Sequence, residues 1–143
     1  ADLTAYAGLE VREGRVGAPG HRETLPAHVD AALRTLEERL SDQPFVAPEQ
    51  RELQAYGLGA REVAAAVRAG RLIRLDDDVV LLPTTPARAM RVLAGLPQPF
   101  TTSQARVALE STRRTVIPLL EHLDGRGWTR RIDGSHREVR RPR

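Results

Sequence analysis

The 143-residue chain contains no cysteine and no lysine, few aromatic residues, and no long uncharged apolar run. The absence of cysteine excludes disulfides, thiolate zinc sites and cysteine nucleophiles. Four histidines are scattered without the spacing of a metal site, so we expect neither a metal nor a cofactor. No apolar run reaches the roughly 18 residues of a membrane helix, and the N-terminus has no signal-peptide pattern. These absences favour a soluble, cytoplasmic protein.

The chain also has only five aromatic residues, which disfavours RNA-binding folds that stack several bases on aromatic side chains. All 22 basic residues are arginine, and they are unevenly distributed. Residues 100–143 hold ten arginines and five acidic residues, a net charge of +5, whereas residues 1–99 have a net charge of −2. We therefore expect a polyanionic partner at the C-terminal third of the chain.

Residues 25–85 have the pattern of three helices followed by a β-hairpin. Apolar residues repeat at i, i+4, i+7 and i+11 from Val29 to Leu40, which is typical of one face of a helix. Two shorter helices are predicted near 48–55 and 60–69, and Gly70 stands where a helix-ending glycine belongs. Two β-like runs then flank the turn Asp76–Asp78. Three helices and a hairpin predict a winged helix.

The same order of elements recurs in residues 86–143. Pro99-Phe100 repeats Pro44-Phe45 at an offset of 55 residues, and Gly127 repeats Gly70 at an offset of 57. Such a period predicts two copies of one unit. We expect a mainly α protein with small β-hairpins, built as tandem winged-helix domains. The first module is residues 25–85 and the second is residues 86–143, while residues 1–24 would be the tail of a preceding winged helix.

The two modules differ in charge where a winged helix usually contacts nucleic acid, at its third helix and its hairpin wing. In the first module the acidic turn Asp76–Asp78 would repel phosphate, so we expect a spacer. In the second module Arg113 and Arg114 begin the third helix, and further arginines follow along the wing. This difference predicts that the second module is the one that binds a polyanion.

Helix geometry supports the same interpretation of the two leading arginines. At about 100° per residue, Arg114 is almost opposite the apolar stripe of the helix and Arg113 is at its edge. Both belong to a helix N-terminus, where backbone N–H groups attract anions. The alternative is a solvated charged face on a winged helix with a purely structural role.

Other residues favour structural roles. Trp128 is more typical of a core anchor than of a base stacker. Ser and Thr at 101–103 and 111–112 are typical of helix caps rather than nucleophiles, and Thr101 with Gln104 matches a capping box. His136 beside the wing turn could contact phosphate or simply be a solvent-exposed turn residue. No constellation of catalytic residues is present.

The amino-acid sequence of the second module contains a distinctive combination of motifs. It contains Phe100-Thr101, then Arg-Arg-Thr-Val-Ile-Pro-Leu-Leu-Glu-His-Leu-Asp over 113–124, then Gly-Trp-Thr-Arg-Arg over 127–131. This combination resembles the C-terminal winged helix of the bacterial selenocysteine-specific elongation factor, SelB type. Residues 25–85 match the preceding winged helix of that family only in layout.

The resemblance implies that the chain is a fragment of a translation factor whose last winged helix binds an mRNA hairpin, the selenocysteine insertion element beside UGA. The ribosome and selenocysteinyl-tRNA would be partners through the missing parent domains, and the fragment would be a monomer. With no GxxxxGK[ST] motif, this piece should not hydrolyse GTP. The predicted RNA-binding residues are Arg113, Arg114, Arg130, Arg131, Arg137 and His136.

Two other classes of function remain open from the sequence. A DNA-binding transcriptional regulator would recognise a duplex and would usually dimerise, but no long dimerisation helix is evident. A protein-interaction winged helix would bind its partner without depending on Arg113 and Arg114. An enzyme is the least favoured class.

Overall fold

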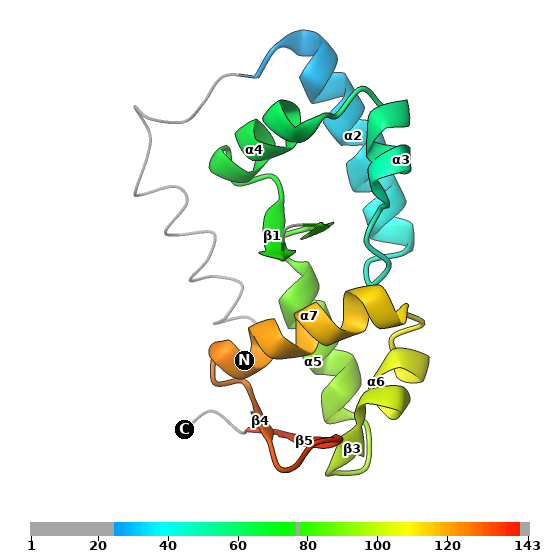
Figure 1. Cartoon of the computed structure of the whole chain (residues 1–143), viewed down its shortest axis with the longest axis vertical. Coiled ribbons are helices and arrows are strands. Elements are labelled where there is room, and N and C mark those ends of the chain that lie inside the picture. The colour runs from blue at the N-terminus through cyan, green and yellow to red at the C-terminus, as the bar shows by residue number, and fades with distance from the viewer. Residues whose placement is uncertain (1–24, 77, 141–143) are drawn as a thin grey trace.

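The structure, a computed structural model, describes residues 25–76 and 78–140. The tail predicted for residues 1–24 lies outside these residues. The first module contains three helices and a two-stranded antiparallel hairpin (Figure 1). Its elements are α2 (Ala27–Asp42), α3 (Gln50–Ala55), α4 (Ala60–Arg68), β1 (Ile73–Asp76) and β2 (Val79–Leu81).

The second module repeats this order and adds one strand. Its helix α5 begins at Thr85, one residue before the predicted boundary, and its wing is a three-stranded antiparallel sheet in the order β3-β5-β4. The predicted fold class, a mainly helical protein with winged helices in tandem, is confirmed. The elements are α5 (Thr85–Ala94), β3 (Phe100–Thr101), α6 (Thr102–Ala108), α7 (Arg113–Gly125), β4 (Thr129–Arg131) and β5 (His136–Val139).

The apolar stripes predicted from the sequence form the core. Val29, Leu33, Leu36 and Leu40 are the buried positions of α2, and the corresponding residues of α7 are completely buried. Complete burial of each such side chain contributes roughly 1.5–3 kcal/mol to the stability of the folded state. Buried residues of both modules belong to one hydrophobic cluster, so the modules share apolar contact as well as chain connectivity.

Both third helices end in the same way, which supports the repeat. Gly70 and Gly127 have positive φ angles of 78° and 75°, a conformation that glycine adopts without steric cost. The next residue then donates its backbone N–H to a carbonyl five positions back, Arg71 to Ala66 at 2.9 Å and Trp128 to Leu123 at 3.0 Å. This closure turns the chain directly from the helix into the wing.

The modules stack along the long axis of the molecule (Figure 1). Helix α7 lies beside the hairpin of the first module and contacts β1. The wing of the second module lies at the far end, away from α2. The start of α7 and the wing turn, which the sequence predicts to form one RNA-binding surface, therefore lie in different surroundings.

Candidate nucleic-acid interface

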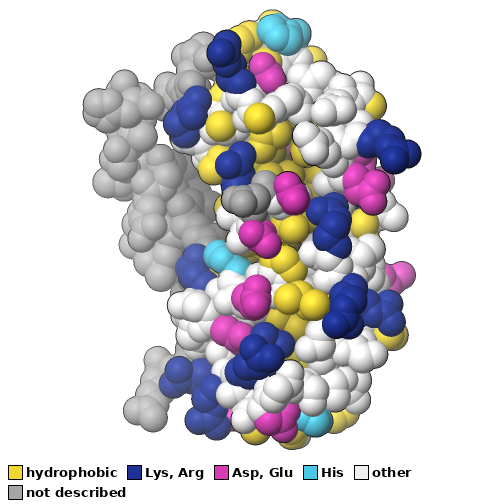
Figure 2. All heavy atoms as spheres, viewed as in Figure 1, with side chains coloured by type: hydrophobic (Ala, Val, Ile, Leu, Met, Phe, Trp, Pro, Cys, Tyr) yellow, Lys and Arg dark blue, Asp and Glu magenta, His cyan; other side chains and the backbone are white. Residues whose placement is uncertain are grey.

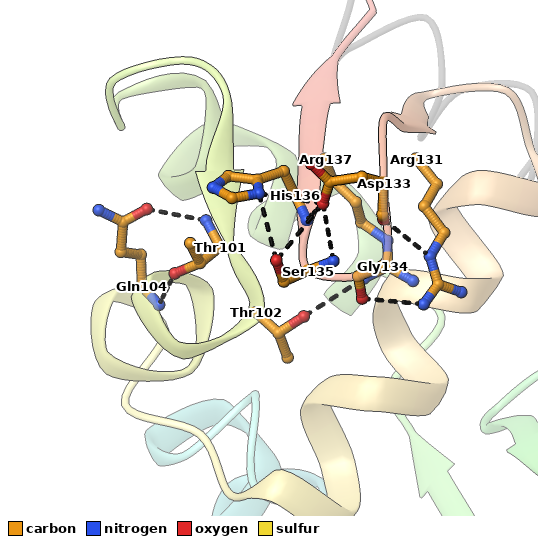
Figure 3. Close-up of polar contacts among 9 residues, drawn as sticks. All are labelled: Thr101, Thr102, Gln104, Arg131, Asp133, Gly134, Ser135, His136 and Arg137. Atoms are coloured by element: carbon orange, nitrogen blue, oxygen red, sulfur yellow. Dashed lines mark hydrogen bonds and ion pairs between the residues drawn. The ribbon is translucent and has the colours of Figure 1, made fainter.

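The turn of the second wing is a compact hydrogen-bonded loop (Figure 3). Oδ1 of Asp133 accepts the backbone N–H groups of Ser135 and His136, each at 2.9 Å, and lies 3.0 Å from Nδ1 of the His136 ring. A side-chain carboxylate that bonds to its own backbone two residues on is a common way to fix a turn. The turn therefore has a defined shape despite its exposure.

The same contacts change the acidity of Asp133. Its pKa is lowered from 3.8 to about 2, chiefly by the hydrogen bond from the Ser135 backbone and then by the His136 side chain. The carboxylate is thus ionised at every pH above this value, and one negative charge lies at the tip of the basic wing. His136, half-buried in the turn, is the group that directly faces this charge.

Arg131 reinforces the turn from the other side. Its Nε donates to the carbonyl of Asp133 at 3.2 Å and its Nη2 donates to the carbonyl of Gly134 at 3.1 Å (Figure 3). The residue is nevertheless exposed. A guanidinium has five N–H donors, so three remain for a phosphate or a base after these two bonds.

Arg130 faces Glu138 across the β4–β5 ladder, and the two side chains form an ion pair. The arginine side chain is 64% exposed, and an exposed pair of this kind contributes at most about 1 kcal/mol. A phosphate could therefore replace Glu138 at little cost.

Arg137 differs from the other wing arginines because it is buried, with 5% of its surface exposed. Its Nε donates to both carboxylate oxygens of Asp124, at 3.0 and 3.2 Å. Thr129 donates to the same carboxylate at 2.6 Å. These bonds join the end of α7 to strands β4 and β5 of the wing. The sequence predicted that Arg137 belongs to the RNA-binding surface, whereas in the structure its side chain is buried inside the module.

The two arginines at the start of α7 have different environments. Arg113 is exposed and, within residues 25–76 and 78–140, has no hydrogen-bond or ion-pair partner. Arg114 donates from Nη2 to the carbonyls of Ala47 at 2.9 Å and Pro48 at 3.1 Å, and from Nη1 to the carbonyl of Asp78 at 3.2 Å. Helix geometry predicted Arg114 on the face opposite the apolar stripe and Arg113 at its edge, and in the structure Arg114 bridges the two modules.

Two hydroxyl groups complete the contact between the modules. Ser111 donates its Oγ to the carbonyl of Phe45 at 2.6 Å, and the backbone N–H of Ala47 donates to Oγ1 of Thr115 at 3.0 Å. Thr112 caps α7 as the sequence predicted. The role of Ser111 and Thr115 between modules was missed, because both bonds span more than 65 positions in the sequence.

A groove of about 580 Å³ lies where Arg114 meets the first module. Apolar residues of α3 and α4 line it together with two acids, Glu49 and Asp78, and two bases, Arg74 and Arg114. Figure 2 shows acidic, basic and apolar side chains interspersed over the middle of this face. Mixed charge gives no net attraction for a polyanion, so the wing and Arg113 are the stronger candidates for an RNA contact.

The described residues hold no cluster of three or more metal-ligating side chains. None of the helices in the described part of the chain is both long and apolar enough to cross a membrane.

Part of the second module matches the model of a known protein family. Residues 91–137 match the family model described as "Elongation factor SelB, winged helix". No curated protein sequence matches the chain closely enough to count as a relative. The family match covers α6, α7 and most of the wing, which includes all six predicted RNA-binding residues.

Two solved structures share the fold. One is described as the mRNA-binding domain of elongation factor SelB from E. coli in complex with SECIS RNA, with 18% identity and a TM-score of 0.61. The match covers 82% of this chain and 100% of that one. The other is a bacterial selenocysteine-specific elongation factor, EF-Sec, with 22% identity and a TM-score of 0.62 over 83% of this chain. Only 20% of the EF-Sec chain is covered, so the present chain corresponds to about a fifth of it.

These findings confirm the resemblance seen in the sequence: the chain has the tandem winged-helix fold of the SelB structures, and its second module matches the winged-helix family of elongation factor SelB.

Proposed function

We propose that this chain is the mRNA-binding part of a selenocysteine-specific elongation factor, and that it recognises the selenocysteine insertion hairpin beside UGA. The observation that carries the proposal is the SelB family match over residues 91–137, which contain the exposed arginines Arg113, Arg130 and Arg131. The structural similarity to a SelB domain in complex with SECIS RNA supports it.

The geometry of the second module suits a hairpin loop. The major groove of an A-form RNA helix is too deep and narrow for side chains, so proteins read unpaired loop bases and the surrounding backbone. A small rigid wing with exposed arginines can enter a loop. In this proposal Arg130, Arg131 and His136 contact the loop from the wing, and Arg113 contacts phosphate from the start of α7.

Arg114 and Arg137 have supporting roles in this proposal. Arg137 holds the wing on α7 through Asp124, and Arg114 holds α7 on the first module. Arg137 is buried, and Arg114, although exposed, donates to three carbonyls of the first module, so in this proposal both contribute to RNA affinity through the position of the surfaces that they join.

The remaining parts of the proposal follow from the parent factor. The chain has no catalytic activity of its own and needs no cofactor. It acts in the cytoplasm as a monomer, and the ribosome and selenocysteinyl-tRNA are reached through other domains of the factor. The first module, with its acidic hairpin, acts as a spacer that does not bind RNA.

Fluorescence anisotropy with a labelled selenoprotein mRNA hairpin tests the function directly. We expect tight binding that depends on the loop sequence, with a salt dependence that corresponds to a few phosphate contacts. A hairpin with a scrambled loop and a DNA duplex are the comparison probes. Equal, weak binding to all three would contradict the proposal and leave only a basic winged helix.

A matched pair of variants separates the wing from general charge. Arg131→Ala removes a wing arginine, and Arg51→Ala removes an exposed arginine from α3 in the first module. We expect only the first to weaken hairpin binding, with circular dichroism showing that both remain folded. Equal losses would mean that net charge, rather than the wing, determines binding.

A further inference from the structure

The wing turn of the second module carries a large apolar side chain of which about half remains exposed. Among the described residues, the exposed large hydrophobic side chains are Val107, with 62% of its surface exposed, and Ile132, with 48%. Ile132 lies between Arg131 and Asp133, at the start of the turn.

The corresponding residue of the first module behaves differently. At the offset of 57 residues Ile132 corresponds to Leu75, which is half-buried and packs against the hydrophobic core. The same position of the same unit is therefore more exposed in the second module than in the first. About half of the Ile132 surface stays in water, and this half contributes nothing to the folding of the second module.

The backbone around Ile132 is held in place. Its N–H donates to the carbonyl of His136 at 2.9 Å, and the carbonyl of Ser135 accepts the N–H of Thr102 at 3.3 Å, which ties the turn to the start of α6. Arg131 and Asp133 fix the rest of the turn. A β-branched side chain on a fixed backbone has few rotamers to lose, so its burial by a partner costs little ordering entropy.

The charges around Ile132 indicate the chemistry of that partner. Arg130 and Arg131 precede it directly, and both are exposed. The carboxylate of Asp133, which follows it, is bonded to the backbone of the turn and to the His136 ring. A ligand that covers this tip must present an apolar surface within reach of negative charge. An unpaired RNA base has both properties, because its ring face is apolar and its phosphate is anionic. Apolar side chains are known to pack against unstacked bases in this way.

We infer that Ile132 is a specificity-determining residue that packs against the face of one unpaired base of the RNA loop while Arg131 contacts the adjacent phosphate. This inference rests on the proposed function and adds a base contact to the charge contacts. It distinguishes a loop from a paired stem, because a stacked and paired base has no free face.

The test compares Ile132→Ala with Val107→Ala, which removes the same kind of exposed apolar surface from α6. The probes are a selenoprotein mRNA hairpin with 2-aminopurine at single loop positions, and a duplex of the same stem without its loop. We expect Ile132→Ala to weaken hairpin binding about 5- to 20-fold, a range based on the contribution of one stacked base. The salt dependence, duplex binding and the Val107→Ala affinity should not change.

Further readouts separate packing from folding. One 2-aminopurine position should change its fluorescence on binding wild type, and this change should be lost in Ile132→Ala and kept in Ile132→Leu. Because about half of Ile132 is exposed, circular dichroism should be the same for all variants and the unfolding midpoint should change little. A hairpin affinity of Ile132→Ala within twofold of wild type, or an equal loss on the duplex, overturns the inference.

Failure of the inference can be told apart from failure of the proposed function. If wild-type protein prefers the hairpin and Ile132→Ala keeps that preference, the base contact is wrong and the hairpin function stands. If wild-type protein binds the hairpin and the duplex equally, the proposed function is wrong and the inference falls with it.

Discussion

Equivalent segments of the two modules have different partners. Phe100–Thr101 forms β3 and pairs with β5 of its own wing. The equivalent segment of the first module, at Phe45, forms no described strand. Its backbone bonds instead to Ser111 and Thr115 at the start of α7. Since nearly all buried backbone groups need hydrogen-bond partners, this segment can either extend its own wing or join the next module. The comparison shows how a repeated unit becomes part of a tandem array.

The wings of the two modules also differ, in their number of strands, their register and the charge of their turns. The first is two-stranded, with an irregular register between Arg74 and Asp76, and its exposed turn residues Asp76 and Asp78 are acidic. The second is three-stranded and regular, with a turn that Asp133 and Arg131 hold in shape. A rigid basic wing suits recognition, and an acidic one does not attract phosphate. The two wings share an antiparallel hairpin and differ in the charge and hydrogen bonding of their turns.

The largest effect is expected at the buried pair of the second module, Asp124 and Arg137, which correspond to Val67 and Val80 of the first at the offset of 57. Arg137→Ala should lower the free energy of unfolding by about 2–3 kcal/mol, because a partly buried carboxylate loses its charged donor. Urea denaturation measures this change.

The double variant Asp124→Val with Arg137→Val is the sharper test of that comparison. It recreates the residue pair of the first module, and replacement of a buried ion pair by apolar groups is often neutral. We expect it to recover most of the stability lost in Arg137→Ala. A double variant as unstable as Arg137→Ala would show that the modules are not interchangeable at this position.

The next effect concerns the contact between modules. Arg114→Ala removes hydrogen bonds to three carbonyl groups and should cost about 1–2 kcal/mol of stability. Two-dimensional NMR should show shifts in the backbone amides of residues 45–47 and of Glu49. The control is Arg113→Ala, one position earlier, and equal effects of the two variants on stability would contradict the bridging role.

Arg113→Ala should weaken RNA binding and leave the stability of the protein unchanged. Because Arg113 is exposed, the free energy of unfolding should be unchanged. Loss of one phosphate contact should weaken hairpin binding about fivefold and reduce the salt slope by about 1. Anisotropy titrations at several salt concentrations measure both quantities, and an unchanged slope would remove Arg113 from the interface.

The smallest effect is a local pH dependence of the second wing turn. The folded pKa of Asp133 is about 2, below its ordinary value of 3.8. The support from its carboxylate is therefore complete above the ordinary pKa and is lost as the pH falls through about 2. NMR should show the Ser135 and His136 amides shifting as the pH falls below 4. Asp133→Asn should reduce the low-pH shift, and an equal shift in that variant would exclude Asp133 as its source.

Much of the fold could be predicted because its signals are local. The spacing of apolar residues located α2 and α7. Gly70 and Gly127 indicated where each third helix turns into its wing. Thr101 and Gln104 form the predicted capping box. Trp128 is buried as expected, with the Arg126 guanidinium 4.5 Å from its ring centroid. The added strand β3 was not predicted, because two residues give no periodic signal and their partner β5 is distant in sequence.

The sequence by itself determined the repeat, the helices, the wings and the charge difference between the modules, since each depends on residue type and short spacing. Only the tertiary structure decided which arginines are free to bind. Arg113 and Arg114 are adjacent and chemically identical, yet only Arg114 reaches the carbonyls of the first module. Arg131 and Arg137 face each other across the wing, yet only Arg137 is buried against Asp124. The physical reason is that the partners of Arg114 and Arg137 belong to other elements of the fold, whose positions residue type and short spacing do not give.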